Sequence, residues 1–366
     1  FGLVAVGQRD IDAWETRYPA MADVWPLAPL QNGLAFHAML AADSVDVYTA
    51  QVVLQLDGAV DARRLRAAGQ AVLDRYPNLR TGFVTAADGT AVQVVDDRAS
   101  LPWREVDLSG AADAGAALDE LTAAERAERF DLAAPPLLRF TLVSMGDNRF
   151  RLVVTNHHIL LDGWSMPLLM KDLLVLYATS GDPSLLPPVR PYRSYLSWLG
   201  EQDIDASMQR WQAELDGVSE PTTVAPVVPG REITALSGEY TFGLGAADTE
   251  RLTTFAADLG VTVNTVVQVV WGILLGRSVG RDDVVFGTTV SGRPAGLSGV
   301  ESMVGLFINT VPVRVQVDPA EKIEGFLTRI QGEQADLLDH HYVGLADIQA
   351  AAGVSGLFDT LVVFES

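Results

Sequence analysis

Residues 156–165 read Asn156-His157-His158-Ile159-Leu160-Leu161-Asp162-Gly163-Trp164-Ser165, and this stretch decides how the chain is interpreted. The apolar run before it, 149–155, predicts a strand that forms a hairpin with 137–144 around Gly-Asp-Asn at 146–148. The two histidines therefore leave a strand and enter a turn that ends in Asp-Gly. Adjacent residues leaving a strand point to opposite faces, so one imidazole can face a cavity while the other packs inward. An imidazole at a strand end suits general-base chemistry, and Gly163 would let a substrate approach the main chain closely.

Strands and helices are mixed on both sides of this stretch. Further strands are expected over 47–56, 79–84, 239–244, 284–290, 306–317 and 361–364. Helices are expected over 61–75, 112–130, 249–259, 264–275 and 320–338, and around Trp198 and Trp211. A further helix is expected to begin at Ser165, with Ser165 as its N-cap. This pattern predicts an α/β fold. A chain of 366 residues exceeds the roughly 250–300 residues that one core supports, and the proline-dense loop 181–191 is the best boundary. We therefore predict two lobes, 1–180 and 181–366.

Composition excludes several classes of function. The chain has 47 Asp and Glu against 26 Lys and Arg, which argues against nonspecific binding to nucleic acid or to an anionic membrane. It has no cysteine, so disulfides, thiolate nucleophiles and Cys-ligated metals are excluded. His340-His341 is a second histidine pair, but it lies in the other half without evident further ligands, so no metal site is expected. No signal peptide opens the sequence, and the apolar run 261–276 is too short and too polar for a membrane span, so a cytoplasmic protein is expected.

The His-His-x-x-x-Asp-Gly pattern, followed by Trp164-Ser165, resembles the signature of the condensation domains of nonribosomal peptide synthetases, which are related to chloramphenicol acetyltransferase. Further segments resemble motifs of that family in the same order along the chain. They are Pro26–His37, Arg75–Phe83, Tyr192–Trp198, Ser291–Pro294, Val304–Thr310 and Leu357–Thr360. Two features depart from the family. His340–Val343 stands where many relatives carry a Gln-Asp-Tyr-Pro-like run, and the family normally continues past residue 366, so the C-terminal lobe is expected to be incomplete.

The resemblance implies two acetyltransferase-like lobes in a V-shaped pseudodimer with a tunnel between them. His158 would be the catalytic residue that faces the tunnel, and Gly163 would offer a backbone N–H near the reacting centre. The resemblance gives supporting roles to other residues. His157 would be a structural neighbour, Asp162 would act through an arginine, Trp164 would pack, and Ser165 would cap a helix. Arg75, Arg80 and Arg293 are the candidate partners of Asp162. Asn309 would either point its amide into the tunnel or support its strand.

The function implied by the resemblance is amide-bond formation in the biosynthesis of peptide antibiotics or siderophores. The donor is an aminoacyl or peptidyl thioester on an upstream peptidyl carrier protein, and the acceptor is an aminoacyl group on a downstream one. Their phosphopantetheine arms come from the carriers, so no cofactor or metal is expected in this chain. Adjacent adenylation or epimerization domains are the other expected partners. The chain begins at Phe1 without a start Met, so we expect a piece of a larger assembly line.

Subtypes and alternatives follow from the same residues. The intact histidine pair argues against a heterocyclization domain, Met166 after Ser165 against an epimerization domain, and the single His37 near the N-terminus against a dual epimerizing-condensing domain. The opening motif and Asn78-Leu79-Arg80 resemble condensing domains that accept a D-configured donor. A catalytically inactive recruitment domain and a stand-alone acyltransferase that uses acyl-CoA remain as alternatives.

Overall fold

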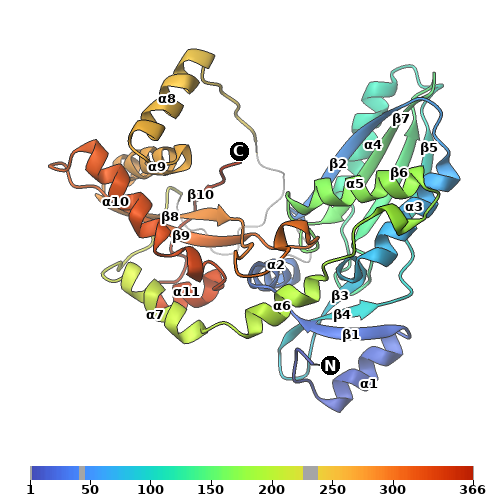
Figure 1. Ribbon diagram of the computed structural model, residues 1–366, viewed down its shortest axis with the longest axis horizontal. Helices are drawn as coiled ribbons and strands as arrows, with labels where there is room; N and C mark the ends of the chain where they lie inside the picture. The colour runs from blue at the N-terminus through green and yellow to red at the C-terminus, as the bar shows by residue number, and fades with distance from the viewer. Residues whose placement is uncertain (1, 41–45, 226–237, 366) are drawn as a thin grey trace. The chain divides into compact units, whose positions relative to one another are not determined.

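The computed structural model describes residues 2–40, 46–225 and 238–365. It divides into two compact units (Figure 1). The first unit comprises Phe1–Glu201 and Arg293–Phe307, and the second comprises Gln202–Gly292 and Ile308–Ser366. This division differs from the one at residue 180, because residues 181–201 and 293–307 both belong to the first unit.

A four-stranded sheet forms the centre of the first unit, in the order β2-β7-β6-β5. Its strands are β2 (Thr49–Asp57), β7 (Arg149–His157), β6 (Leu138–Ser144) and β5 (Trp103–Asp107). β7 pairs antiparallel with both neighbours, and β5 pairs parallel with β6. Gly146, Asp147 and Asn148 have positive φ angles at the turn between β6 and β7, which confirms the predicted hairpin.

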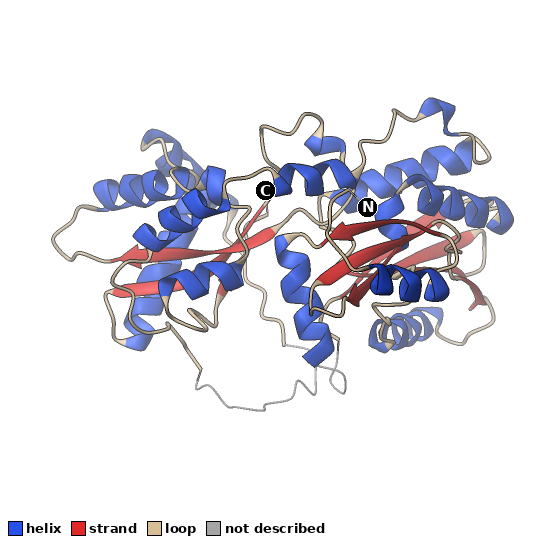
Figure 2. Cartoon of the chain, turned by 90° about the horizontal axis from the view of Figure 1, so that it is seen from below, coloured by secondary structure: helices blue, strands red, loops and turns tan. Residues whose placement is uncertain are grey.

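Helices cover both faces of this sheet (Figure 2). α3 (Ala62–Arg75) and α5 (Ser165–Ala178) pack together on one face. α3 approaches the sheet so closely at Gly69 that a Cβ atom there would lie 3.3 Å from the Phe140 ring. α4 (Ala114–Ala127) lies on the other face, where the carbonyl of Thr122 accepts a hydrogen bond from the Gln51 side chain of β2. The end of β7 is therefore held between two helical layers.

A smaller antiparallel sheet completes the first unit. Its strands are β1 (Met21–Pro26), β4 (Ala91–Asp96) and β3 (Thr81–Thr85), in the order β1-β4-β3. α1 (Gln8–Arg17) packs Trp14 against this sheet, and α2 (Pro29–Leu40) begins three residues after β1. α6 (Tyr192–Gly200) shares an apolar core with Trp25 and with Val300, Met303 and Phe307, which places segment 293–307 in this unit. The short 3-10 turns here are η1 (Pro77–Arg80), η2 (Pro183–Leu185) and η3 (Val300–Ser302).

The second unit is built on a three-stranded sheet in the order β10-β8-β9. β8 (Asp283–Val290) pairs antiparallel with β9 (Asn309–Gln316) and parallel with β10 (Leu361–Val362). One apolar core joins this sheet to α8 (Ala246–Asp258), α9 (Val263–Val279) and α10 (Ile323–Ala335). A second core joins it to α7 (Ile204–Glu214) and α11 (Leu345–Ala352), with η4 (Leu338–His340) beside them. Val284 and Phe286 lie in the first core and Val285 in the second, as alternation along a strand requires.

α8 and α9 follow one another directly in the second unit. Thr262 caps α9 by accepting a hydrogen bond from the Thr265 N–H, and Gly280 ends it with a φ of 71°. Within 2–40, 46–225 and 238–365, no single helix combines the length and the apolar character needed to cross a bilayer. α8 and α9 meet that criterion only when taken together, and they are bent by 102° at their junction.

Several of the expected strands differ in the structure. β3 begins at Thr81, after the 3-10 turn η1, and not at residue 79, and β10 ends at Val362 and not at residue 364. Apolar side chains alternate along residues 239–244, but these residues form no strand. No described strand pairs with them to supply hydrogen-bond partners. Tyr240, Phe242 and Leu244 are instead exposed. β9 begins at Asn309 and not at residue 306. Leu306 and Phe307 use their main-chain groups in the first unit, where they bond Tyr192 and Asp162.

Candidate active site

His158 lies directly after the last residue of β7. Its backbone N–H donates a 2.7 Å hydrogen bond to the carbonyl of Tyr48, and Thr49 at the start of β2 is paired with His157. The imidazole is half-buried, and its Nδ1 atom is buried without a hydrogen-bond partner among the described residues. A buried polar atom left unpaired costs about 1–3 kcal/mol and calls for an explanation, of which a role in binding or catalysis is one. The backbone of His158 is fixed, while Nδ1 of its ring is left without a hydrogen-bond partner among the described residues.

His157 is fully buried and has two polar neighbours. Its Nδ1 accepts the N–H of Ile159 at 3.1 Å, and its Nε2 lies 3.5 Å from Oδ2 of Asp46. Because Nδ1 acts as an acceptor, the proton of the neutral ring belongs on Nε2, toward the carboxylate. Burial lowers the pKa of His157 from 6.5 to about 4, with Asp46 opposing and with His158 and Arg129 adding to the shift. His157 is therefore neutral at pH 7, and its position matches the expected structural neighbour.

The depressed pKa of His157 predicts a specific loss of stability in acid. The unfolded chain takes up this proton near pH 6.5, whereas the folded chain resists it down to about pH 4. Between these values the free energy of unfolding should fall as pH falls, by up to about 1.4 kcal/mol per pH unit for this group. Urea titrations between about pH 7.5 and 4.5 should show a shallower fall for His157→Gln. Equal slopes for wild type and His157→Gln would contradict the assignment.

Asp162 is the most heavily bonded side chain in the motif. Its Oδ1 accepts the N–H of Ser165 at 2.8 Å, and its Oδ2 accepts the N–H of Phe307 at 3.0 Å. Its own N–H donates to the carbonyl of Gly305 at 3.1 Å. Its carboxylate also pairs with the guanidinium of Arg293, at 3.2 Å from Nη2 to Oδ1, and the Asp162 side chain is 0% exposed. These bonds tie the turn after His158 to segment 293–307.

Arg293 is thus the arginine partner that the sequence left open among three candidates. Its Nη1 donates to the carbonyls of Val300 and Met303, and its guanidinium lies over the Phe307 ring, 3.9 Å from the centroid. Burial lowers the pKa of Arg293, and the charge of Asp162 opposes that shift.

The other two candidate arginines are engaged elsewhere in the first unit. Arg75 pairs with Asp172 at 2.9 Å, from Nε to Oδ2. Arg80 donates from Nε to the carbonyl of Leu73 at 3.0 Å. Both arginines therefore support the region around α3, and neither is the partner of the motif aspartate.

Ser165 differs from its expected role as a helix cap, whereas Trp164 packs on segment 293–307, with its ring centroid 5.8 Å from the Arg293 guanidinium. Ser165 is the first residue of α5 and does not cap it, because the Asp162 carboxylate accepts the first free N–H. The Ser165 hydroxyl donates instead to the carbonyl of Gly305 at 2.8 Å and accepts the N–H of the same residue at 3.0 Å. Trp164 is 59% exposed and is not packed in the core, although its Nε1 donates to the carbonyl of Glu301 at 2.9 Å.

Gly163 and Asn309 complete the expected set. Gly163 is exposed, and a Cβ atom built there would have no atom within 4 Å, so one side of its main chain is open. Asn309 lies at the start of β9 in the second unit. Its Nδ2 donates to the carbonyls of His341 and Val343 at 2.8 and 2.7 Å, which agrees with the alternative in which this amide supports its strand.

Sequence reasoning missed three residues that hold the histidines. Asp46 and Tyr48 contact His157 and His158, and the Gln31 side chain binds the carbonyl of Ile159 at 2.9 Å. The sequence predicts a strand from residue 47 onward, but it does not show which strand this one pairs with. Its pairing with β7 is what places Asp46 and Tyr48 beside the histidines. Gln31 lies within a matched motif, but a glutamine inside a helix gives no sign of its target.

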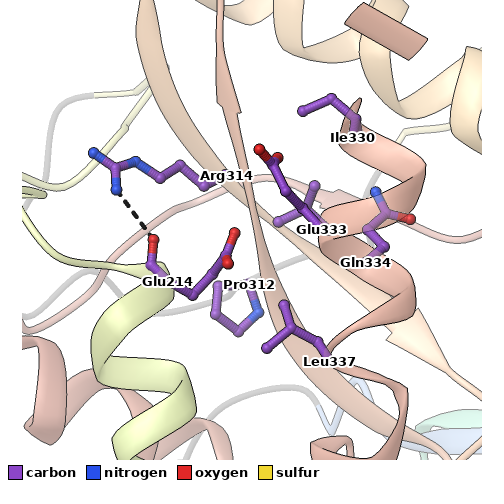
Figure 3. Close-up of a pocket in the computed structure, with 8 residues that line it drawn as sticks. Glu214, Pro312, Arg314, Ile330, Glu333, Gln334 and Leu337 are labelled. Carbon is purple, nitrogen blue, oxygen red and sulfur yellow. Dashed lines mark hydrogen bonds between the residues drawn. The ribbon is translucent and has the colours of Figure 1, made fainter. Parts of the chain in front are cut away.

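The second unit has a separate small pocket between α7, β9 and α10 (Figure 3). It is lined by Glu214, Pro312, Val313, Arg314, Ile330, Glu333, Gln334 and Leu337. Arg314 spans one side by donating to the carbonyl of Glu214 at 3.0 Å. Burial raises the pKa of Glu214, and the Glu333 charge adds to this effect. None of the candidate site residues lines this pocket, and the described residues hold no cluster of three His, Asp or Glu side chains arranged to bind a metal ion.

Comparison with known proteins identifies the family. The model of the family described as "Condensation domain" matches residues 21–366. One of the linear gramicidin synthase proteins of Brevibacillus parabrevis is 36% identical over 376 residues, and surfactin synthase subunit 3 from Bacillus subtilis (strain 168) is 34% identical over 348 residues. These alignments cover 100% and 94% of this chain. The chain spans only 5% and 27% of the length of these two relatives.

Solved structures show the same fold. The starter condensation domain of rhizomide synthetase superposes with a TM-score of 0.76 at 19% identity, over 98% of this chain and 80% of that one. The first condensation domain of the calcium-dependent antibiotic synthetase gives 0.74 at 21% identity, over 93% and 81%. The expected α/β fold is therefore confirmed. On the family match and on relatives more than 30% identical over nearly its whole length, this chain belongs to the condensation domain family.

Proposed function

We propose that this chain forms an amide bond between an aminoacyl or peptidyl thioester on an upstream carrier protein and an aminoacyl group on a downstream one. The observation that carries the proposal is His158, whose backbone is fixed at the end of β7 while its half-buried ring retains an unpaired Nδ1 among the described residues. Gly163, open on one side, follows in the same turn. The relatives are synthases named for gramicidin and surfactin, which supports a place in peptide antibiotic assembly.

The chemistry requires little beyond positioning and one imidazole. The acceptor amine attacks the thioester carbonyl, the C–N bond forms, the C–S bond breaks, and the amine proton ends on the departing thiol. A thioester is already activated, so the absence of cysteine from the chain is no obstacle. Holding both tethered ends together can supply up to about 7–11 kcal/mol of the barrier reduction. His158 would accept the amine proton or stabilise the charged tetrahedral intermediate, and Gly163 would offer its N–H to the carbonyl oxygen.

The partners follow from the same proposal. Two peptidyl carrier proteins, one upstream and one downstream, would bring their phosphopantetheine arms to His158. Adenylation or epimerization domains would adjoin the chain. The matched form of Asn78-Leu79-Arg80 favours a D-configured donor, which loading the upstream carrier with the D- or the L-aminoacyl group would test.

Mixing the chain with both loaded carriers should produce the dipeptidyl group on the downstream carrier, detected by intact mass. Omitting the chain, or leaving either carrier unloaded, should abolish the product. Turnover of free acyl-CoA, with none of the carrier-bound donor, would replace this proposal by a stand-alone acyltransferase. Carrier binding without any product from either donor would replace it by a recruitment domain.

A further inference from the structure

We propose that Gln31, together with His157, positions His158 by fixing the main chain of Ile159. The inference rests on the proposed function of His158 and goes beyond it by assigning a role to a side chain in α2. Gln31 is 1% exposed, in the third position of that helix. It lies 128 positions from its target in the sequence, and both residues belong to the first unit.

The peptide groups around His158 are each held by a different element. The His158 N–H donates to the Tyr48 carbonyl at 2.7 Å, which fixes the peptide before its Cα. The Ile159 N–H donates to Nδ1 of His157 at 3.1 Å, which fixes the peptide after it. The carbonyl of Ile159 accepts the Gln31 Nε2 at 2.9 Å, which fixes the next peptide. The fully buried Ile159 side chain anchors the same residue in the core. Rotation of the His158 backbone would therefore break at least one of these bonds.

The amide of Gln31 is chemically suited to this position. Its Nε2 supplies the donor that the Ile159 carbonyl needs, and its Oε1 accepts the N–H of Ala28 at 2.8 Å, just before α2. Gln93, also fully buried, donates to the same Oε1 at 2.9 Å and to the carbonyl of Pro26 at 2.8 Å. A leucine would offer neither group, and an ionised glutamate would turn an oxygen toward the Ile159 carbonyl. Buried amides are retained when each of their polar groups is paired, as here.

The principal alternative is that this bond only stabilises the fold. The second unit supplies a matched control for that alternative. Gln268 is also 1% exposed, and it donates to Thr288 Oγ1 at 3.0 Å and accepts from Gln334 Nε2 at 2.6 Å. Gln268→Leu removes a buried amide with a comparable set of bonds, and both of these partners belong to the second unit. It should lower the resistance to urea without altering the rate per folded molecule.

The test measures single-turnover amide formation by Gln31→Leu and Gln31→Glu with both carriers loaded, at a temperature where urea titration shows each variant folded. A displacement of reacting groups by about 1 Å can lower a reaction rate by about 100-fold. We therefore expect both Gln31 variants to form the amide about 10- to 100-fold more slowly, with unchanged affinity for the carriers. Histidine-labelled NMR gives an independent readout. The signals of His157 and His158, assigned by loss in single variants, should shift or broaden in Gln31→Leu but not in Gln268→Leu.

Each outcome bears on a separate claim. Wild-type rates with unaltered His158 signals in Gln31→Leu would overturn the positioning role, as would equal rate losses in Gln31→Leu and Gln268→Leu. If the wild type forms no dipeptide while the His158 signals still respond to Gln31→Leu alone, the proposed function fails and the positioning of the ring stands.

Discussion

Replacing His158 by alanine is expected to reduce amide formation by about 10²–10⁴-fold, the usual contribution of a positioned general base. The half-buried ring makes no hydrogen bond through Nδ1 to any described residue, so its loss leaves no partner unsatisfied at that atom. The backbone bond to Tyr48 survives the substitution because it uses the main chain. The variant should therefore fold and bind both carriers as wild type does. Single-turnover product formation on the downstream carrier measures the loss.

A second histidine provides the matched control for this experiment. His37 is exposed on α2, and His37→Ala should retain the wild-type rate. Near-normal condensation by His158→Ala would remove the imidazole from the mechanism and leave proximity as the whole source of rate enhancement. A fall in carrier affinity equal to the fall in rate would show that the ring binds substrates and does not take part in the chemical step.

Local signals in the sequence predicted most of the secondary structure and the centre of the candidate site. The hairpin around 146–148 and the helix expected over 61–75 were correct, because turn and cap chemistry act over a few residues, as where the Asp61 side chain accepts the N–H of Arg64 at the start of α3. The strand expected over 239–244 failed because alternation shows only that a segment can pair, and no described strand pairs with it. Long-range partners were equally hard to choose. Nothing local separates Arg293 from Arg75 or Arg80, since the choice depends on where segment 293–307 crosses the turn.

The same limit explains the error at the start of α5. A serine with a proline two positions later, at the start of a helical pattern, is typical of an N-cap, yet the hydroxyl of Ser165 binds Gly305, 140 residues away. That contact requires Gly305 to approach closely, and its main chain lies so near Tyr192 that a Cβ atom would be 2.3 Å from the ring. The sequence shows the glycine and the tyrosine, but their contact follows only from the path of segment 293–307.

Asp162→Asn is expected to destabilise the first unit by about 3–5 kcal/mol, because it leaves a buried arginine without its counter-ion. The Arg293 side chain is 6% exposed and has little access to water that could replace the carboxylate. In the native protein both carboxylate oxygens accept a backbone N–H, one from Ser165 and one from Phe307. The NH₂ group of an asparagine would replace one of these acceptors by a donor, which would then face an N–H. Urea titration near neutral pH measures the loss, and Asp248→Asn is the matched control. Asp248 pairs with Arg251 on the surface, where both side chains are more than half exposed, so its loss should cost at most about 1 kcal/mol.

The partner substitution separates charge from packing in this result. If the uncompensated charge dominates, Asp162→Asn combined with Arg293→Met should be less destabilised than the sum of the two single variants, since the second change removes the stranded cation. If packing dominates, the losses should add, because methionine also gives up the bonds of Arg293 to Val300 and Met303. A loss below about 1 kcal/mol for Asp162→Asn alone would contradict the role assigned to this pair. The turn that carries His158 would then owe its conformation to the Tyr48, His157 and Gln31 bonds without the help of segment 293–307.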